Sequence, residues 1–326
     1  MYLINAFLTS GVEVIISEFR YKKLLKELNL FLIKSNQTLS PKLAKRIRFY
    51  MIQSAITNLW FSTLRGYSIN KNEALSGQYL GALTPVYDDL MDNYGLTHEQ
   101  ITNNKDLNTS QEKVLFDYLF TNLLNFVSNQ ETFIYYFKKL GNAQNHSLKQ
   151  NSIITLSKYQ IKQITYDKGG YATLLYRSIL DHPLLDGEEE AIYHLGALLQ
   201  ITNDLFDSYK DAQSQTQTLA TIGFNVDELT NEFIQLKDHT IHLFLQLGYD
   251  EKNIRGTIYQ MVSVMSRGKV YLEHLKNIQK GSFFKASDFS RNELMVDMEK
   301  WPTLKINYAI SKKWMDDLLR SNALSN

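Results

Sequence analysis

Two short acidic stretches contain the residues of this sequence whose types and spacing could do chemistry. The first acidic stripe consists of Asp88, Asp89 and Asp92, and the second acidic stripe of Asn203, Asp204, Asp207 and Asp211. Each follows an apolar helical run, and residues four apart on a helix lie only about 40° apart in projection. Carboxylates held side by side repel one another and attract Mg²⁺, which favours oxygen ligands and often shares them with substrate phosphates. Two such stripes facing each other across a cavity would bind a metal–diphosphate group, as an enzyme active site would.

Cationic residues occur at three places where a diphosphate site would need them. The first is an upstream cluster of Lys45, Arg46 and Arg48, and the second is a single lysine, Lys168. The third is a late helical group, Arg267 and Lys269 with Tyr271. Arginine makes two-pronged contacts with phosphate, and lysine supplies a point charge. We therefore expect these side chains to bind the diphosphate of a substrate.

The composition indicates a large globular protein. The chain has 326 residues, of which 44% are hydrophobic, and a net charge of +1 gives no reason to expect nucleic acid as a partner. The absence of cysteine excludes disulfides and fits a reducing compartment. The first sixteen residues lack a basic segment and a cleavage site, and no apolar run approaches the ~20 residues of a membrane span. These features predict a soluble cytoplasmic protein.

Helical periodicity dominates the sequence, and only four prolines interrupt it. It predicts helices over 16–32, 41–67, 73–93, 114–140, 188–211, 226–247, 251–278 and 301–319, with a further helix that ends or kinks at Gly169-Gly170. Polar breaks are expected at 102–111 and 141–151, and residues 213–218 read as a mobile loop beside the site. We predict an all-α fold, a single domain over residues 1–326 with about ten or more helices around a central cavity.

The acidic stripes together with the basic cluster resemble the motifs of class I isoprenoid synthases. An Asp-Asp-x-x-Asp helix, an upstream Lys-Arg-x-Arg cluster and a downstream Gln-x-x-Asn-Asp-x-x-Asp helix starting at Gln200 are similar to those of trans-prenyltransferases, squalene and phytoene synthases and terpene cyclases. The similarity lies between about residues 42 and 225, within a motif-bearing core of about 42–280. It implies that Asp88, Asp92, Asn203, Asp207 and Asp211 bind two or three Mg²⁺ ions, with Mn²⁺ as a substitute.

The resemblance also implies the roles of the remaining site residues. Asp89 and Asp204 would complete the catalytic set, and the diphosphate would be bound by the cationic residues named above together with Gln200 and Tyr271. The partner would be an allylic prenyl diphosphate. Peripheral membrane contact for an apolar product and a homodimer are compatible with the resemblance.

Two departures from the trans-prenyltransferase pattern bear on the reaction. Those enzymes follow the first motif with Arg-Arg-Gly, where this chain reads Asn93-Tyr94-Gly95, and they follow the second with Gly-Lys-Pro, which is missing here. Both departures count against a second diphosphate site for isopentenyl diphosphate, whereas Lys45 and Arg46 favour one.

Three functions are therefore kept open. The preferred one is Mg²⁺-dependent ionisation of an allylic diphosphate followed by terpene cyclisation or by prenyl–prenyl condensation of the squalene/phytoene type. Head-to-tail elongation with isopentenyl diphosphate is the alternative, and a non-catalytic homologue that binds prenyl lipids is the third. His239 and His242 lie three apart with no third metal ligand in view, so we interpret them as surface histidines.

Overall fold

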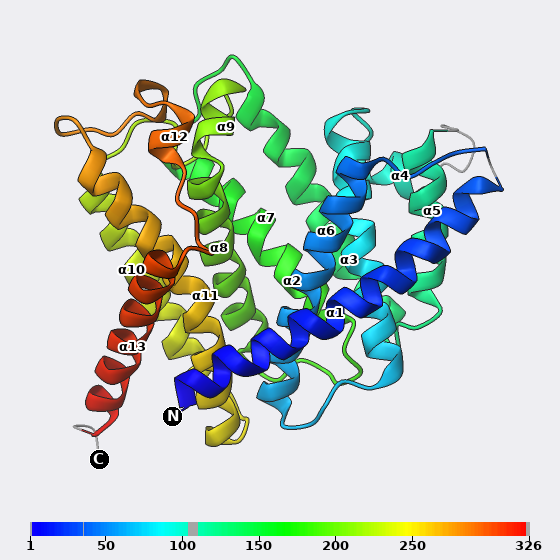
Figure 1. The fold of residues 1–326 in the computed structure, drawn as a ribbon, viewed down its shortest axis with the longest axis horizontal. Helices are drawn as coiled ribbons and strands as arrows, with labels where there is room; N and C mark the ends of the chain where they lie inside the picture. The colour runs from blue at the N-terminus through cyan, green and yellow to red at the C-terminus, as the bar shows by residue number, and fades with distance from the viewer. Residues whose placement is uncertain (1, 35, 104–109, 324–326) are drawn as a thin grey trace. The chain divides into compact units, whose positions relative to one another are not determined.

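The computed structural model describes residues 2–34, 36–103 and 110–323. In this part of the chain the regular structure consists of thirteen α-helices and two short 3₁₀-helices (Figure 1). No strand occurs among these residues, apart from an isolated antiparallel bridge between Phe224 and Phe284. The all-α prediction is confirmed.

The helices have the following bounds. They are α1 (Tyr2–Ile33), α2 (Pro41–Arg65), α3 (Lys71–Asp92), α4 (His98–Asn103), α5 (Gln111–Leu124), α6 (Gln130–Ser147), α7 (Lys158–Ser178), α8 (Glu188–Phe206), α9 (Ser208–Gln213), α10 (Val226–Leu245), α11 (Glu251–Ile278), α12 (Arg291–Leu294) and α13 (Trp301–Ala323), with 3₁₀-helices η1 (Leu148–Asn151) and η2 (Ala286–Asp288).

The chain divides into two compact units. The first unit comprises Met1–Phe7, His146–Tyr171 and Leu185–Asn326, and the second comprises Leu8–Asn145 and Ala172–Leu184. The change from one to the other falls inside α7, between Tyr171 and Ala172. The assignment of residues 1–326 to a single domain stays a prediction.

In the second unit, α2 and α3 pack closely against each other (Figure 1). Local sequence fixes their ends: Ser40 caps α2, whose first residue is Pro41, and Asn70 forms a capping box with Glu73 at the start of α3. The backbones come close at Gly81, where an added Cβ would lie 2.8 Å from the Cα of Met51. This close packing positions Asp88 and Asp89 of α3 beside Arg46 of α2.

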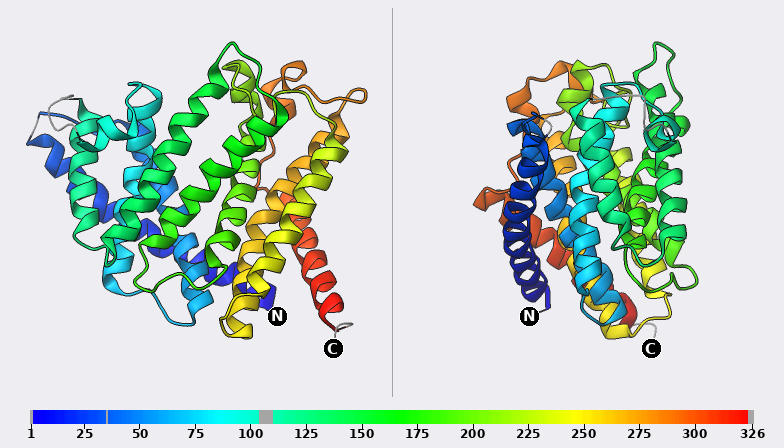
Figure 2. Two further views of the ribbon diagram at one scale, coloured as in Figure 1. Left: turned by 180° about the vertical axis from the view of Figure 1, so that it is seen from behind. Right: turned by 90° about the vertical axis from the view of Figure 1, so that its right-hand side faces the viewer.

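In the first unit, α10 contacts both α8 and α11, and α11 also contacts α13. Figure 2 shows α10, α11 and α13 side by side, coloured from yellow-green to red. The N-termini of α10 and α11 are capped by the side chains of Asn225 and Asp250. The buried core of this unit includes Phe233, Phe244 and Met261.

The expectations for residues 114–151 differ from what is observed, whereas the one for residues 102–111 is largely untested. The run 114–140 forms two helices rather than one, because α5 ends at Leu124 and the side chain of Asn129 accepts a hydrogen bond from Thr132 N at the start of α6. The expected break at 141–151 is wrong, because α6 continues to Ser147 and η1 follows directly. The break at 102–111 lies largely outside the described residues, since 104–109 are not among them.

The glycine pair in α7 does not end the helix, contrary to that part of the prediction. The helix runs without interruption from Lys158 to Ser178. A Cβ on Gly169 would lie 2.1 Å from the carbonyl oxygen of Gly196, and one on Gly170 would lie 2.2 Å from the ring of Tyr193. The two glycines therefore serve the close approach of α7 to α8.

Within the described residues, no helix combines the length and the apolar character that a membrane crossing requires.

Candidate active site

The second acidic stripe spans the junction between α8 and α9 in the first unit. Helix α8 ends at Phe206, and Asp207 stands between it and α9, with φ −87° and ψ 3°. The amide of Asp207 donates to Asn203 O at 2.9 Å, and the amide of Asp211 donates to Asp207 O at 2.8 Å. These backbone hydrogen bonds, each between residues four apart, continue the helical pattern across the junction.

Asp204 is the most enclosed residue of this stripe, with 7% of its surface exposed. Its two carboxylate oxygens accept hydrogen bonds from Gln200 Nε2 at 2.8 Å and from Thr165 Oγ1 at 3.1 Å. Burial raises the pKa of Asp204 to about 6, although these hydrogen bonds and the charge of Lys168 act to lower it. Thr165 was missed in the sequence, although it lies one helical turn before Lys168 on α7.

Asp211 is also perturbed by its neighbours. Burial, followed by the negative charges of Asp204 and Asp207, raises the pKa of the Asp211 carboxyl to about 7, and Lys168 again acts to lower it. The donor set fits Mg²⁺, because carboxylates whose charges oppose one another's ionisation lose that penalty when a divalent cation binds them. The structure brings Gln200, Lys168 and these aspartates together, whereas Asn203 is exposed.

The first acidic stripe lies on the last turns of α3 in the second unit, where Arg46 pairs with two of its members. Arg46 Nη1 lies 2.5 Å from Asp89 Oδ1, and Arg46 Nη2 lies 3.8 Å from Asp88 Oδ2. The side chains of Asp88 and Asp89 are only 16% and 20% exposed. The guanidinium thus reduces the repulsion between these two carboxylates.

Asp88 has two further partners that the sequence did not reveal. Gln144 Nε2 donates to its Oδ1 at 3.0 Å, and the hydroxyl of Tyr50 donates to its Oδ2 at 3.3 Å. The charge of Asp88, together with burial, raises the pKa of Tyr50 well above its ordinary value. Asp92, the third member of the stripe, is exposed at the end of α3. Its oxygens are thus the most accessible to an ion.

The other cationic residues differ in where they point. Lys45 is exposed, and Arg48 Nη2 lies 2.6 Å from Glu18 Oε1 of α1, away from the first stripe. Of the late group on α11, Arg267 is exposed, and Lys269 lies 3.7 Å from Glu273 Oε1.

Tyr271 is buried, and its hydroxyl is engaged within the first unit. It donates to Leu294 O at 2.7 Å and lies 3.0 Å from Ser208 Oγ, at the start of α9. Its ring meets Phe206 edge-on at 5.0 Å. Tyr271 thus packs against both sides of the α8–α9 junction. Its contact with diphosphate stays a prediction.

The segment read as a mobile loop, residues 213–218, is hydrogen-bonded to residues 150–156. Gln217 N donates to Gln150 O at 2.9 Å, and the Gln217 side chain accepts from Leu156 N at 2.8 Å and donates to Ile154 O at 2.9 Å. Gln213 itself ends α9.

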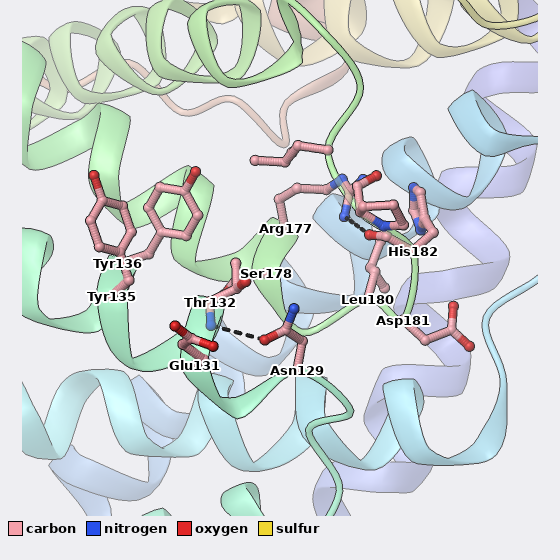
Figure 3. Close-up of a pocket in the computed structure, with 12 residues that line it drawn as sticks. Asn129, Glu131, Thr132, Tyr135, Tyr136, Arg177, Ser178, Leu180, Asp181 and His182 are labelled. Atoms are coloured by element: carbon pink, nitrogen blue, oxygen red, sulfur yellow. Dashed lines mark hydrogen bonds between the residues drawn. The ribbon is translucent and has the colours of Figure 1, made fainter.

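A cavity of about 450 Å³ lies within the second unit (Figure 3). Among its lining residues is buried Arg177, whose guanidinium donates to the carbonyl oxygens of His182 and Pro183 at 3.1 and 3.2 Å. No member of either stripe lines this cavity, so the predicted central cavity remains a prediction.

Two groups of three acidic or histidine side chains in the described part of the chain bring potential metal-ligand atoms within 4.8 Å of one another. Neither contains a member of the acidic stripes. One consists of Glu73, Asp181 and His182 in the second unit. Arg65 Nη1 fills its centre, 2.5 Å from Glu73 Oε1 and 3.1 Å from both Asp181 Oδ1 and His182 Nδ1. Burial acts to raise the pKa of Glu73, but the hydrogen bonds from Arg65 and the backbone bring it down to about 2. This group is a buried ion-pair network.

The other group consists of Glu190 and His194 of α8 and His239 of α10. His239 is exposed, in agreement with the interpretation as a surface histidine, and it has two neighbours with ligand atoms that the sequence analysis did not identify. A signal for two of the three residues is present in the sequence, where a Glu and a His lie four residues apart within one predicted helix.

Comparisons with known proteins find only distant structural similarity to this chain. No family model matches the sequence, and no curated protein matches it. A geranyltransferase from Legionella pneumophila is similar in structure, with 14% identity, 79% of this chain and 99% of that chain covered and a TM-score of 0.44. A geranyltranstransferase from Methanosarcina mazei has 17% identity, 78% and 97% coverage and a TM-score of 0.45. A UbiA homologue from Archaeoglobus fulgidus bound to GPP and Mg²⁺ has 13% identity, 83% and 97% coverage and a TM-score of 0.43. Similarity at this level assigns neither a family nor an activity. An activity has to be argued from the chain's own residues.

Proposed function

We propose that this chain is an enzyme that ionises an allylic prenyl diphosphate with the help of Mg²⁺ and joins the resulting cation to an alkene. The observation that carries the proposal is the second acidic stripe, where carboxylates of raised pKa lie within the influence of Lys168. Such perturbed, partly buried carboxylates beside a cation are typical of a functional site.

The chain's residues have distinct roles in this proposal. Asp207 and Asp211 of the first unit would hold Mg²⁺, and so would Asp88 and Asp92 of the second; the bound ion would neutralise the charge that develops on the departing diphosphate. Lys168 binds a diphosphate oxygen. No side chain acts as a nucleophile, since the bond to the departing diphosphate breaks by ionisation.

Arg46 has a second role at the first stripe. In the structure its single positive charge offsets part of the negative charge of Asp88 and Asp89, two adjacent carboxylates with little exposure. If Asp88 and Asp89 offered their oxygens to Mg²⁺ instead, the guanidinium of Arg46 would be free to bind two phosphate oxygens in two-pronged geometry. Arg46 thereby couples metal binding to diphosphate binding.

The identity of the alkene acceptor divides two candidate reactions. Cyclisation or prenyl–prenyl condensation needs no isopentenyl diphosphate, and Tyr94, in the place of an expected arginine, donates to Glu112 Oε2 at 2.7 Å instead of offering a cation. Head-to-tail elongation is the second candidate, and exposed Lys45 beside Arg46 favours it.

The test is an incubation with Mg²⁺ and allylic diphosphates of ten to twenty carbons, with and without isopentenyl diphosphate, followed by analysis of released diphosphate and products. We expect diphosphate release from the allylic diphosphate alone. Isopentenyl diphosphate should have no effect, because the loss of two charged contacts raises its dissociation constant by roughly two to four orders of magnitude. A longer linear diphosphate formed with isopentenyl diphosphate would establish elongation. No release under any condition, together with binding of the prenyl chain, would establish the non-catalytic alternative.

A further inference from the structure

A three-residue group on the surface of the first unit has the composition of a transition-metal site. Glu190 and His194 lie four residues apart near the start of α8, and His239 lies on α10, which packs against α8. One ligand atom from each side chain lies within 4.8 Å of the others. The two imidazole rings meet edge-to-face with centroids 4.8 Å apart.

The hydrogen bond of His194 orients its ring for metal binding. Its Nδ1 lies 2.9 Å from the backbone oxygen of Glu190. A carbonyl oxygen only accepts, so Nδ1 carries the proton and Nε2 keeps its lone pair. Metal-binding histidines almost always donate their other ring N–H to such an acceptor, which fixes the tautomer and the ring orientation.

The other two ligands are accessible and not otherwise engaged. Among the described residues, none forms a hydrogen bond or an ion pair with the carboxylate of Glu190 or the imidazole of His239. Both side chains are exposed. A cation arriving from solvent therefore displaces no protein partner, in contrast to the Glu73 group, whose centre is filled by Arg65.

We propose that Glu190, His194 and His239 form a binding site for a borderline divalent cation such as Zn²⁺, Co²⁺ or Ni²⁺. Two imidazole nitrogens and one carboxylate oxygen are a ligand set of zinc, with water in the fourth position. Mg²⁺ prefers oxygen ligands and does not compete for it. The site is separate from the second acidic stripe, because the ten residues from His194 to Asp204 span about 15 Å of helix.

The bound cation joins α8 to α10. Since its ligands come from two helices that are adjacent only in the folded state, binding stabilises the folded protein against unfolding. The site thereby makes the stability of the helix that carries the second acidic stripe depend on a metal other than Mg²⁺. This role goes beyond the proposed function and does not depend on it.

Zn²⁺ binding by isothermal titration calorimetry to metal-stripped full-length protein, in millimolar Mg²⁺, tests the proposal. We expect one Zn²⁺ per chain, a higher thermal unfolding midpoint with Zn²⁺, and Co²⁺ absorption bands typical of four-coordination. Because losing even an outer partner of a metal ligand costs about 10–100-fold in affinity, His194→Ala and His239→Ala should each weaken Zn²⁺ at least tenfold.

His242 offers a matched control on the same helix. It is an exposed histidine whose Nε2 is engaged by Gln246 at 3.0 Å, and His242→Ala should bind Zn²⁺ as the unchanged protein does. If an alanine variant unfolds, His239→Gln keeps a polar side chain of similar size and removes the imidazole. Absence of Zn²⁺ binding, or equal affinity in the unchanged protein and the His194→Ala/His239→Ala variant, overturns the proposal.

Discussion

Single carboxylates carry the proposed chemistry, and they differ in how the protein holds them. Asp88 accepts hydrogen bonds at both oxygens and lies beside Arg46, whereas Asp92 is exposed. Asp204 is enclosed by Gln200 and Thr165. Each substitution therefore tests a different environment.

We predict that Asp88→Asn and Asp207→Asn each lower the rate of diphosphate release by about 10²–10³, since that is the effect of removing one electrostatic contact to a transition state. The fold should persist, because asparagine keeps the size of the side chain and an acceptor oxygen. Turnover with Mg²⁺ and an allylic diphosphate, alongside circular dichroism, measures both effects. Asp186→Asn, at an exposed aspartate outside both stripes, is the control and should stay fully active. Near-normal activity in both variants would refute a role for the stripes.

Stability should depend on pH through the raised pKa values of Asp204 and Asp211, about 6 and about 7 against an ordinary value of 3.8. A carboxyl whose folded-state pKa is raised stabilises the folded protein fully below its unfolded pKa, and this contribution is lost as pH rises through the folded pKa. In EDTA, the unfolding midpoint of the unchanged protein should therefore fall relative to that of Asp211→Asn between about pH 4 and pH 7. At pH 7 and above, Mg²⁺ should raise the unfolding midpoint of the unchanged protein again relative to that of Asp211→Asn. A midpoint difference that is constant over this range would contradict the predicted titration.

At the scale of elements, the glycine pair of α7 shows that close packing can outweigh helix propensity. Alanine is the better helix former by about 1 kcal/mol, yet at position 169 its methyl group would overlap the backbone of α8. Gly11, within α1, has no atom within 4 Å of the position of a Cβ. The two positions form a matched pair.

We predict that Gly169→Ala lowers the free energy of unfolding by about 1–3 kcal/mol, because a backbone atom cannot move aside as a flexible side chain can. Gly11→Ala should raise it by up to about 1 kcal/mol. Urea unfolding of both variants measures the difference. Equal effects of the two substitutions would mean that the helices separate at little cost.

Most helices were predictable because residues next to their ends cap them. Ser40 with Pro41 marks the start of α2, and Asp250 marks the start of α11. The break before α6 has a local signal as well, the capping side chain of Asn129, which the prediction missed. The uninterrupted α7 was not predictable, because its glycines are explained by the close approach of α8. The site divides in the same way. The stripes follow from residue spacing along the chain. The contacts of Arg46 with Asp89, of Thr165 with Asp204 and of His239 with His194 depend instead on how separate helices pack.

At the scale of the whole molecule, the two compact units share α7, whose residues 158–171 belong to the first and 172–178 to the second. Helix formation is cooperative, so unfolding of one part of this helix weakens the other. We therefore predict a single unfolding transition, in keeping with the predicted single domain.

Tryptophans in both units provide the measurement. Trp60 is buried in α2 of the second unit, and Trp314 lies on α13 of the first, with Lys237 Nζ 4.8 Å from the ring centroid. Variants that keep only one of the two tryptophans, with phenylalanine at the others, should each show fluorescence and far-ultraviolet circular dichroism changes at the same urea concentration. Separate transitions for the two probes would indicate two domains.

The continuity of α7 also restricts how this gene can change in length. One residue inserted near Tyr171 would turn everything after it by about 100° and advance it by about 1.5 Å relative to the residues before it. Gly169 would keep its place against α8 while Arg177 would turn away from the carbonyl groups of His182 and Pro183. Substitutions along α7 can accumulate singly, but insertions and deletions there should be eliminated, so that this helix keeps its number of residues as the loops around it lengthen and shorten.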